Sequence, residues 1–393
     1  MKKFTKILAL CVSVAALSAA FAGCNRKSSD SKTATSANWN VRTSSAVEHD
    51  SVDFWRNNKE VATYSVSFTR GSNPTYSVVY TPETVGGDRD ENDLVKKTYM
   101  TDGAYSTAFY IDKNDYDWAA DTVPENFRME DKTSIVYVYE TTFTVSGKYV
   151  LSNGTEGETF TDKVTSICKF RLAGENLKPV YSKQVIKNTA ARNLSASNLE
   201  EACISIDAEY ETFYNFKCNK AITYTCEHTE DGDKNTEKTY SVGGSQSVFD
   251  NSQLKIAARA MALSSSSTKT FKVAVPQNGV TQSCSAAVSS SVQLSNETEE
   301  GKKITAVLDS ADGYIFFKDN STDENKPRNY RFNAVNFSLN AKMAGTSVTN
   351  WYASMENADI NYTRCVMLKT VSPLSFSMGT LSYTITNLAV EAF

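Results

Sequence analysis

Hydrophobic and polar residues alternate with a period of two over much of the chain. Between Ile135 and Leu151, apolar and aromatic side chains occupy most odd positions, and Ser, Thr, Glu and Lys occupy many even ones. After a polar turn at 152–158, a second alternating run covers 160–172. This pattern predicts an antiparallel hairpin with one apolar and one polar face. Because its strands are unusually long, the sheet is expected to twist and curl.

The same alternation recurs along the rest of the chain. It is clear at 204–216 and 222–226, and a polar turn is expected at 229–235. The apolar positions of the last strand change parity at Gly379, which predicts a β-bulge there. Further strands are predicted at 63–69, 75–81, 105–111, 180–187, 268–275, 280–292, 303–308, 313–318, 330–341, 362–371 and 374–390.

One segment has a helical period instead. Leu254, Ala257, Ala258 and Met261 follow one helix face after Asp250-Asn251, a pair that suits an N-cap, so a helix is predicted over 251–263. A shorter helix is expected near residue 197. Few helices beside many long strands indicate a mainly β fold: long curved antiparallel sheets, half-barrel or open-barrel like, with one or two short helices.

The first 23 residues have the features of an export signal. Lys2, Lys3 and Lys6 precede an uncharged apolar run that is too short to span a membrane comfortably. The run ends in Phe21-Ala22-Gly23-Cys24, which resembles the lipobox of bacterial lipoproteins, with Phe21 where that family prefers Leu. The resemblance implies cleavage before Cys24 and attachment of lipid to that cysteine.

The residues after Cys24 suit a tether. They are rich in Ser, Thr and Lys and nearly free of aliphatic side chains, so they cannot bury enough surface to fold. The strand pattern is interrupted again at 188–197. We predict a signal peptide (1–23), a lipidated disordered tether (24–46), an N-terminal antiparallel β domain (47–190) and a C-terminal β domain (195–393). The protein is expected on the cell membrane or outer membrane, lipid-anchored and facing outside the cytoplasm.

Several segments of the C-terminal half resemble a family of uncharacterised bacterial envelope proteins, a domain of unknown function. The resemblance lies in Val248-Phe249-Asp250-Asn251, Arg259-Ala260-Met261-Ala262-Leu263, the strand 270–276 and the closing segment 373–383. That family is distantly similar to the half-barrel carriers of the LolA and LppX kind. The resemblance implies a curled antiparallel sheet around an apolar cavity closed by helices, and it brings no catalytic signature.

Charge and cysteine content narrow the possible partners. The net charge of −4 falls to −7 when the three lysines of the signal leave, and no basic run is present, which argues against nucleic acid. When Cys11 leaves with the signal and Cys24 carries lipid, six cysteines remain. An even number of cysteines in an exported protein permits disulfides, and Cys218 and Cys226 are the pair nearest in sequence. Alternatively, these cysteines are small buried apolar residues. The six are Cys168, Cys203, Cys218, Cys226, Cys284 and Cys365.

Catalytic and metal-binding patterns are weak. The two histidines, His49 and His228, are interpreted as surface residues, and no catalytic or nucleotide-binding motif occurs. Asp88–Asp93 and Asp231–Asn235 begin like calcium loops, but both lack the Gly and Glu that such loops need at their sixth and twelfth positions. We therefore predict no enzymatic activity, no metal site and no cofactor.

Aromatic residues are the remaining functional signal. The chain has 20 Tyr, 19 Phe and 4 Trp. Most alternate in phase with Val and Ile, which favours cross-strand packing. Exposed contact with a ligand is expected of Trp39, Trp55, Trp118 and Trp351, above all of Trp118 in its loop. We expect a membrane-anchored extracytoplasmic lipoprotein that binds a lipid or other hydrophobic ligand; the alternatives are a cell-surface glycan- or protein-binding module and a structural envelope protein.

Overall fold

The computed structural model describes most of the chain after residue 51. Several predicted features lie outside the described residues: the predicted signal peptide and tether, Cys24, His49, the segment Asp88–Asp93 and the predicted helix near 197. The described ranges are 52–70, 78–79, 95–128, 133–151, 156–173, 176–190, 204–229, 231–244, 246–260, 268–289, 298–311, 332–339, 347–354, 364–373 and 379–393.

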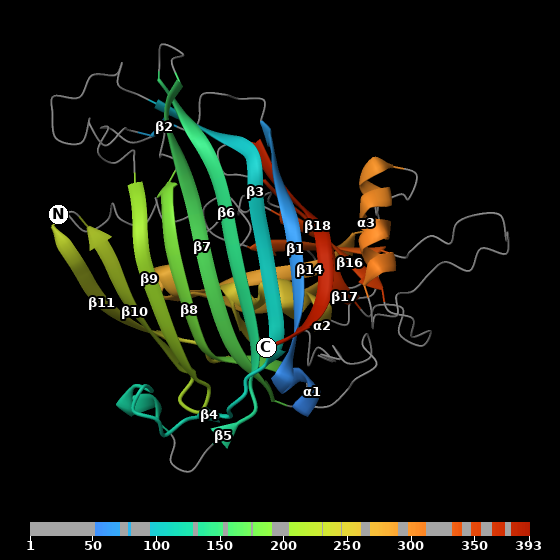
Figure 1. Ribbon diagram of the computed structural model, residues 1–393. Helices are drawn as coiled ribbons and strands as arrows, with labels where there is room; N and C mark the ends of the chain where they lie inside the picture. Colours follow the sequence, from blue (N-terminus) through green and yellow to red (C-terminus); the bar gives the residue numbers. More distant parts are fainter. Residues whose placement is uncertain are drawn as a thin grey trace, which may run out of the picture.

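Within these ranges, sixteen strands form one large sheet, which confirms the predicted mainly β fold (Figure 1). The strand order is β11-β10-β9-β8-β7-β6-β3-β1-β18-β17-β16-β15-β14-β13-β12, with β2 beside β3. The first half consists of β1 (Asn58–Arg70), β2 (Val78–Val79), β3 (Val95–Ile111), β6 (Tyr137–Leu151), β7 (Glu156–Ala173), β8 (Asn176–Ala190), β9 (Ile204–Asn215), β10 (Lys220–Thr229) and β11 (Gly232–Ser241). The second half consists of β12 (Val248–Asp250), β13 (Thr268–Val275), β14 (Val280–Ser289), β15 (Phe332–Leu339), β16 (Ser347–Ser354), β17 (Arg364–Pro373) and β18 (Gly379–Ala392).

The β6–β7 hairpin follows the predicted alternation closely. Tyr139 lies opposite Cys168, and Phe143 lies opposite Val164. All four side chains are buried, and so are Thr141 and Ser166 between them, whose hydroxyls hydrogen-bond to each other (2.7 Å). The alternate residues, such as Glu140, Thr142 and Thr165, face the other side of the sheet. The strands have 15 and 18 residues, so the right-handed twist accumulates into a strong curl.

The curled sheet encloses a short helical segment. The 3₁₀ turn η9 (Asn251–Gln253) leads into α2 (Leu254–Ala260), which confirms the predicted helix up to residue 260. Leu254, Ile256 and Ala257 belong to one core cluster with side chains from β1, β3, β16 and β18. The strands from both halves of the sheet therefore pack around the same helix. In the described part of the chain, β11 and β12 at the two ends of the sheet are not paired with each other, so the sheet is open.

The outer side of the sheet carries smaller elements. α3 (Glu299–Ser310) lies against β17 and β18, where Glu300 accepts hydrogen bonds from Lys369 (2.6 Å) and Thr384 (3.1 Å). The segment with β4 (Tyr116–Asp117), η7 (Glu125–Phe127) and β5 (Thr133–Ser134), here called the 112–134 flap, covers the lower end of β8–β10 (Figure 1). The remaining elements are α1 (Val52–Asn57) and η10 (Pro276–Asn278).

Two predictions about single elements are wrong. Residues 303–308 form part of α3 rather than a strand, because Thr298 caps the helix and Ile304 and Leu308 bury one helix face. The predicted turn at 229–235 spans only Thr229–Gly232, and the next residues pair in β11. The sheet is antiparallel as predicted, except that the short strand β12 runs parallel to β13. The strand 313–318 and residues 374–378, before the predicted bulge at Gly379, lie outside the described residues.

The sheet continues across the boundary expected from the sequence. β8 includes residues 188–190, the start of that boundary, and pairs with β9 from Tyr181↔Phe213 to Ala190↔Ile204. At the ends of the described chain, β1 pairs with β18 from Asn58↔Ala392 onward. Among the described residues, no helix is long and apolar enough to cross a membrane.

Candidate functional site

The helical segment inside the sheet begins at a buried aspartate. Asp250 caps η9 through a capping box: its carboxylate accepts a hydrogen bond from the Ser252 backbone N–H (2.8 Å), and the Gln253 side chain accepts one from the Asp250 N–H (3.1 Å). The same carboxylate accepts hydrogen bonds from the hydroxyls of Ser182 (2.7 Å) and Tyr214. A fully buried charge is tolerated only when it is hydrogen-bonded this thoroughly. Asp250 therefore fixes the start of the helix against β8 and β9.

The C-terminal end of α2 is held by a buried ion pair. Arg259 donates two parallel hydrogen bonds to Glu60 on β1, with Nη1–Oε1 at 2.6 Å and Nη2–Oε2 at 3.1 Å. The two side chains are only 10% and 4% exposed. Bidentate geometry is what makes such a pair sustainable away from water. The guanidinium also lies over the ring of Phe109 at 5.8 Å.

Lys255 lies on the same helix face as Arg259, four residues earlier, but its charge is not compensated. Among the described residues, no carboxylate or other hydrogen-bond acceptor contacts its amine. Its nitrogen lies over the rings of Tyr105 (4.0 Å) and Tyr383 (4.7 Å), which is cation–π geometry. Desolvation inside the protein lowers the pKa of this amine to about 7. The side chain nevertheless keeps part of its surface exposed.

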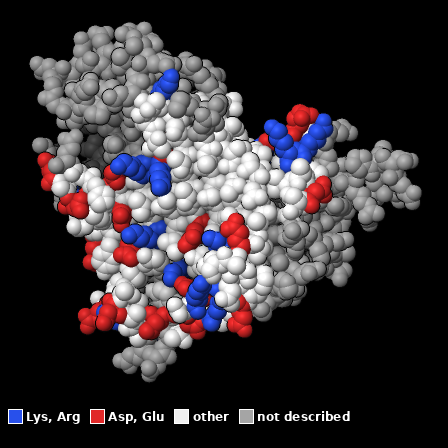
Figure 2. All heavy atoms as spheres, in the orientation of Figure 1, with Lys and Arg blue, Asp and Glu red and all other residues white. Residues whose placement is uncertain are grey.

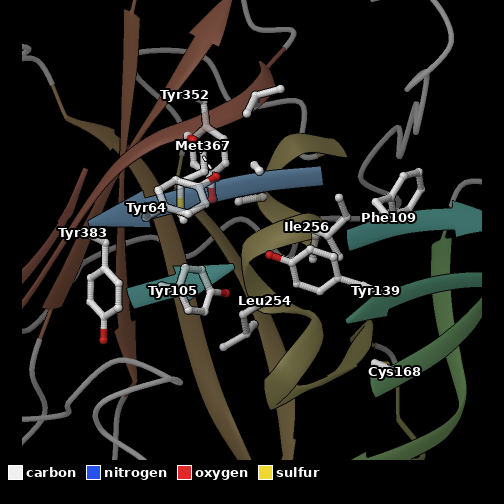
Figure 3. Close-up of a cluster of buried hydrophobic side chains, with 14 of the residues drawn as sticks. Tyr64, Tyr105, Phe109, Tyr139, Cys168, Leu254, Ile256, Tyr352, Met367 and Tyr383 are labelled. Atoms are coloured by element: carbon white, nitrogen blue, oxygen red, sulfur yellow. Dashed lines mark hydrogen bonds between the residues drawn. The ribbon is translucent and has the colours of Figure 1, made fainter. Parts of the chain in front are cut away.

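Tyrosine side chains from five strands surround α2 (Figure 3). Neighbouring rings contact each other across strands, with centroids 5.4 Å apart for Tyr64–Tyr105 and 5.3 Å apart for Tyr105–Tyr383. Tyr64 donates a hydrogen bond to the Met367 carbonyl (2.8 Å). Burial raises the pKa of Tyr64 and Tyr105 well above the ordinary value, so both phenols stay protonated. The five are Tyr64, Tyr105, Tyr139, Tyr352 and Tyr383.

These residues combine an amine of lowered pKa with an aromatic surface. A lone cationic amine on an aromatic surface is suited to an anionic group attached to an apolar body. The other chemically versatile group near the helix is the Cys168 thiol, and burial, followed by the charge of Asp250, raises its pKa. A thiol with a raised pKa is a poor nucleophile. We therefore identify Lys255 and the tyrosines around it, here called the Lys255 site, as the candidate site.

Sequence reasoning had no means of finding Lys255. A lysine on a helix between apolar positions is usually solvated. Lys255 is desolvated only because the sheet curls around α2. The signal that existed was indirect: the helix has Leu254, Ile256, Ala257 and Ala258 on nearly all sides, and a helix that is apolar around its circumference is a buried one.

The prediction that Trp118 is an exposed ligand contact is wrong. Trp118 is only 2% exposed and packs with Val136 and Val180, so it attaches the 112–134 flap, of which it is part, to β8. Its indole N–H donates to the Ser134 hydroxyl (3.3 Å). Trp55 is buried as well, and Trp39 lies outside the described residues. The aromatic residues of the sheet pack across strands, as the alternation favoured.

Four cysteines whose side chains the structure describes are unpaired. Cys168, Cys218, Cys226 and Cys284 are free thiols, so a Cys218–Cys226 disulfide is not formed. These two lie near opposite ends of β10, whose extended backbone holds them apart. Cys168 and Cys284 are buried, as their positions among apolar strand residues indicated. Cys203 lies outside the described residues.

His228 is exposed, as expected, but it is not isolated. It faces Asp233 across the β10–β11 hairpin, with the imidazole Nδ1 2.8 Å from a carboxylate oxygen, and Cys226 is close to both. The sequence signal was a Cys-x-His pair on one strand. It was missed because Asp233 was assigned to a turn rather than to the facing strand.

Comparisons with known proteins add little to this description. No family model matches the chain, and no curated protein matches it. Among solved structures, a β-barrel-like protein of the domain of unknown function DUF1849 from Brucella abortus is similar, with a TM-score of 0.38 and 8% sequence identity over 86% of this chain and 99% of that one. At that TM-score and identity, the similarity provides no basis for a functional inference.

Proposed function

We propose that this chain is an extracytoplasmic lipoprotein, anchored through Cys24, that binds an amphiphile with an acidic headgroup at the Lys255 site. The observation that carries the proposal is Lys255 itself, an amine with an uncompensated charge among buried aromatic rings. The export signal and lipobox at residues 1–24 support the anchored location.

The chemistry of the site suits such a ligand. An anionic group beside the amine would stabilise the protonated form that desolvation now disfavours. A charge-assisted hydrogen bond in these surroundings contributes more than one in water. The rings of Tyr105 and Tyr383, which are almost wholly buried, surround the amine with apolar surface and strengthen its interaction with an anion. Arg259 does not compete for the acid, because Glu60 already neutralises it.

Binding of a fluorescent fatty acid tests this proposal. The mature chain with Cys24→Ser would be titrated with a dansyl-labelled fatty acid, alone and with Lys255→Met. We expect binding to the parent and a loss of roughly tenfold or more in affinity on Lys255→Met, as for removal of a hydrogen bond to a charged group. Lys303→Met, which removes an exposed lysine of α3, should bind like the parent. Equal affinity in all three proteins would refute the role of Lys255.

A structural envelope protein is the second candidate. It is favoured by the side chains of α2, which fill the inside of the sheet as part of one continuous core cluster. In that case Lys255 and its rings would serve stability alone. The titration separates the two functions, since a structural protein should not bind the labelled fatty acid with any dependence on Lys255.

A further inference from the structure

The β10–β11 hairpin brings three metal-ligating side chains together outside the Lys255 site. Cys226 and His228 are two residues apart on β10, so their side chains leave the same face of the strand. His228 is paired directly with Asp233 on β11. The thiol sulfur, an imidazole nitrogen and a carboxylate oxygen all lie within 4.8 Å of one another.

This donor set has a definite chemical preference. Sulfur and imidazole nitrogen are ligands for Zn²⁺ and related transition metals, whereas Ca²⁺ and Mg²⁺ select oxygen ligands. Metal–ligand bonds of about 2.0–2.3 Å would require only a modest contraction of the cluster. Because all three side chains are at least partly exposed, an ion could reach them from solvent.

The neighbouring strand places further acidic residues beside the cluster. Glu209 on β9 is paired with Cys226, and the carboxylates of Asp207 and Glu209 form ion pairs with Lys187 (3.2 Å) and Lys183 (2.8 Å). Basic and acidic side chains are interspersed over the outer face of β8–β11 (Figure 2). The acidic side chains of β9 therefore lie beside the three ligands and are themselves paired with lysines of β8.

A surface groove adjoins the cluster. It has a volume of 510 Å³ and is lined by Cys226 together with Lys183, Glu209, Tyr224, Asn235 and Glu237, among others. Since Cys226 belongs to both the groove and the cluster, an ion bound there would lie beside the groove. Three protein ligands leave a coordination position for water or for a group lying in the groove, as in sites where zinc acts on a substrate.

We propose that Cys226, His228 and Asp233 bind one divalent transition metal ion of the zinc class, with a coordination position open to the groove. The site is separate from the proposed lipid function and does not depend on it. It would also fasten β11, the exposed edge strand of the sheet, to β10 near the tip of the hairpin.

Cobalt and zinc titrations of the full chain, stripped of metal with chelator and kept reduced, test the site. Co²⁺ should bind with one-to-one stoichiometry and give the near-ultraviolet charge-transfer absorption of a thiolate–cobalt bond, and Zn²⁺ should displace it. Cys226→Ser should abolish this absorption. Cys218→Ser is the matched control, because it removes an exposed free thiol from the turn at the other end of β10 and should leave the absorption unchanged.

Two further variants test the metal site without changing the Cys226 thiol. Loss of a residue that hydrogen-bonds to a metal ligand lowers metal affinity roughly 10–100-fold. His228→Ala and Asp233→Asn remove proposed ligands themselves, so each should weaken Zn²⁺ binding by at least as much. Circular dichroism would verify that each variant keeps its β structure. Absence of the absorption in the parent, its survival in Cys226→Ser, or unchanged affinity in both other variants would overturn the proposal.

Discussion

The Lys255 amine is the side-chain group most at odds with its surroundings in the described part of the molecule. Most buried charges there have partners: Asp250 has hydroxyl and backbone donors, and Glu60 has Arg259. Lys255 has only the faces of two tyrosine rings. A buried charge without a partner reduces stability. Proteins keep such groups mainly at functional sites, so this arrangement is typical of a binding site.

This residue makes stability depend on pH in a defined direction. The pKa of Lys255 is about 7 in the folded protein and about 10.4 in an unfolded chain. Between these values the unfolded chain binds one proton more than the folded one, so stability rises with pH. Below pH 7 both forms are protonated and this contribution is constant.

We expect the free energy of unfolding to gain about 1.4 kcal/mol per pH unit from this group between pH 7.5 and roughly 9. Urea unfolding of the ligand-free protein at several pH values would measure it. Lys255→Met should remove the rise, and Lys303→Met should retain it. If the free energies of unfolding of the parent and of Lys255→Met changed with pH in the same way, that result would contradict the lowered pKa.

At the level of elements, the strands with one buried face were predicted best from the sequence. The hairpin of β6 and β7 was predictable because its apolar residues alternate in register. The strand β11 was not, since it is an edge strand with nearly all of its residues exposed, and its polar sequence resembles a turn. That error concealed the pairing of His228 with Asp233. α3 was misread because the apolar residues near Ile304 are too few to separate a helix from a strand without weighing the Thr298 cap.

The 112–134 flap illustrates the same limit and gives a prediction. A tryptophan in a loop is expected to be exposed, but Trp118 packs the flap against β8 by its contact with Val180. Trp118→Ala should therefore lower the free energy of unfolding by about 3–5 kcal/mol. Ile135→Ala in the same region should have a small effect, since Ile135 is 43% exposed. Chemical denaturation would measure both, and equal stability of the two variants would mean that Trp118 is not packed as described.

On the scale of the whole molecule, the ends of the described chain meet in the sheet. β1 lies between β3 and β18, so the first and last strands pair with each other. The sheet encloses α2 only when strands from both halves are in place. The Lys255 site is therefore a property of the complete sheet and not of either predicted domain alone.

The proposed membrane anchor is also tested at the scale of the whole protein. If Cys24 carries lipid, the protein should sediment with membranes and be released by detergent but not by high salt. Cys24→Ser, expressed with the signal peptide intact, should remain unlipidated and lose this behaviour. Cell fractionation with immunoblotting would decide the matter. Firm membrane association of Cys24→Ser would show that some other feature attaches the chain.

Native mass spectrometry of the protein as isolated from the cell envelope tests ligand binding most directly. We expect a bound species that is heavier than the apoprotein by the mass of one acidic amphiphile, and solvent extraction should recover that amphiphile. Lys255→Met should greatly reduce that species, and Lys303→Met should keep it. A parent protein that shows only its apo mass, and takes up no acidic amphiphile after delipidation, would contradict the proposed function.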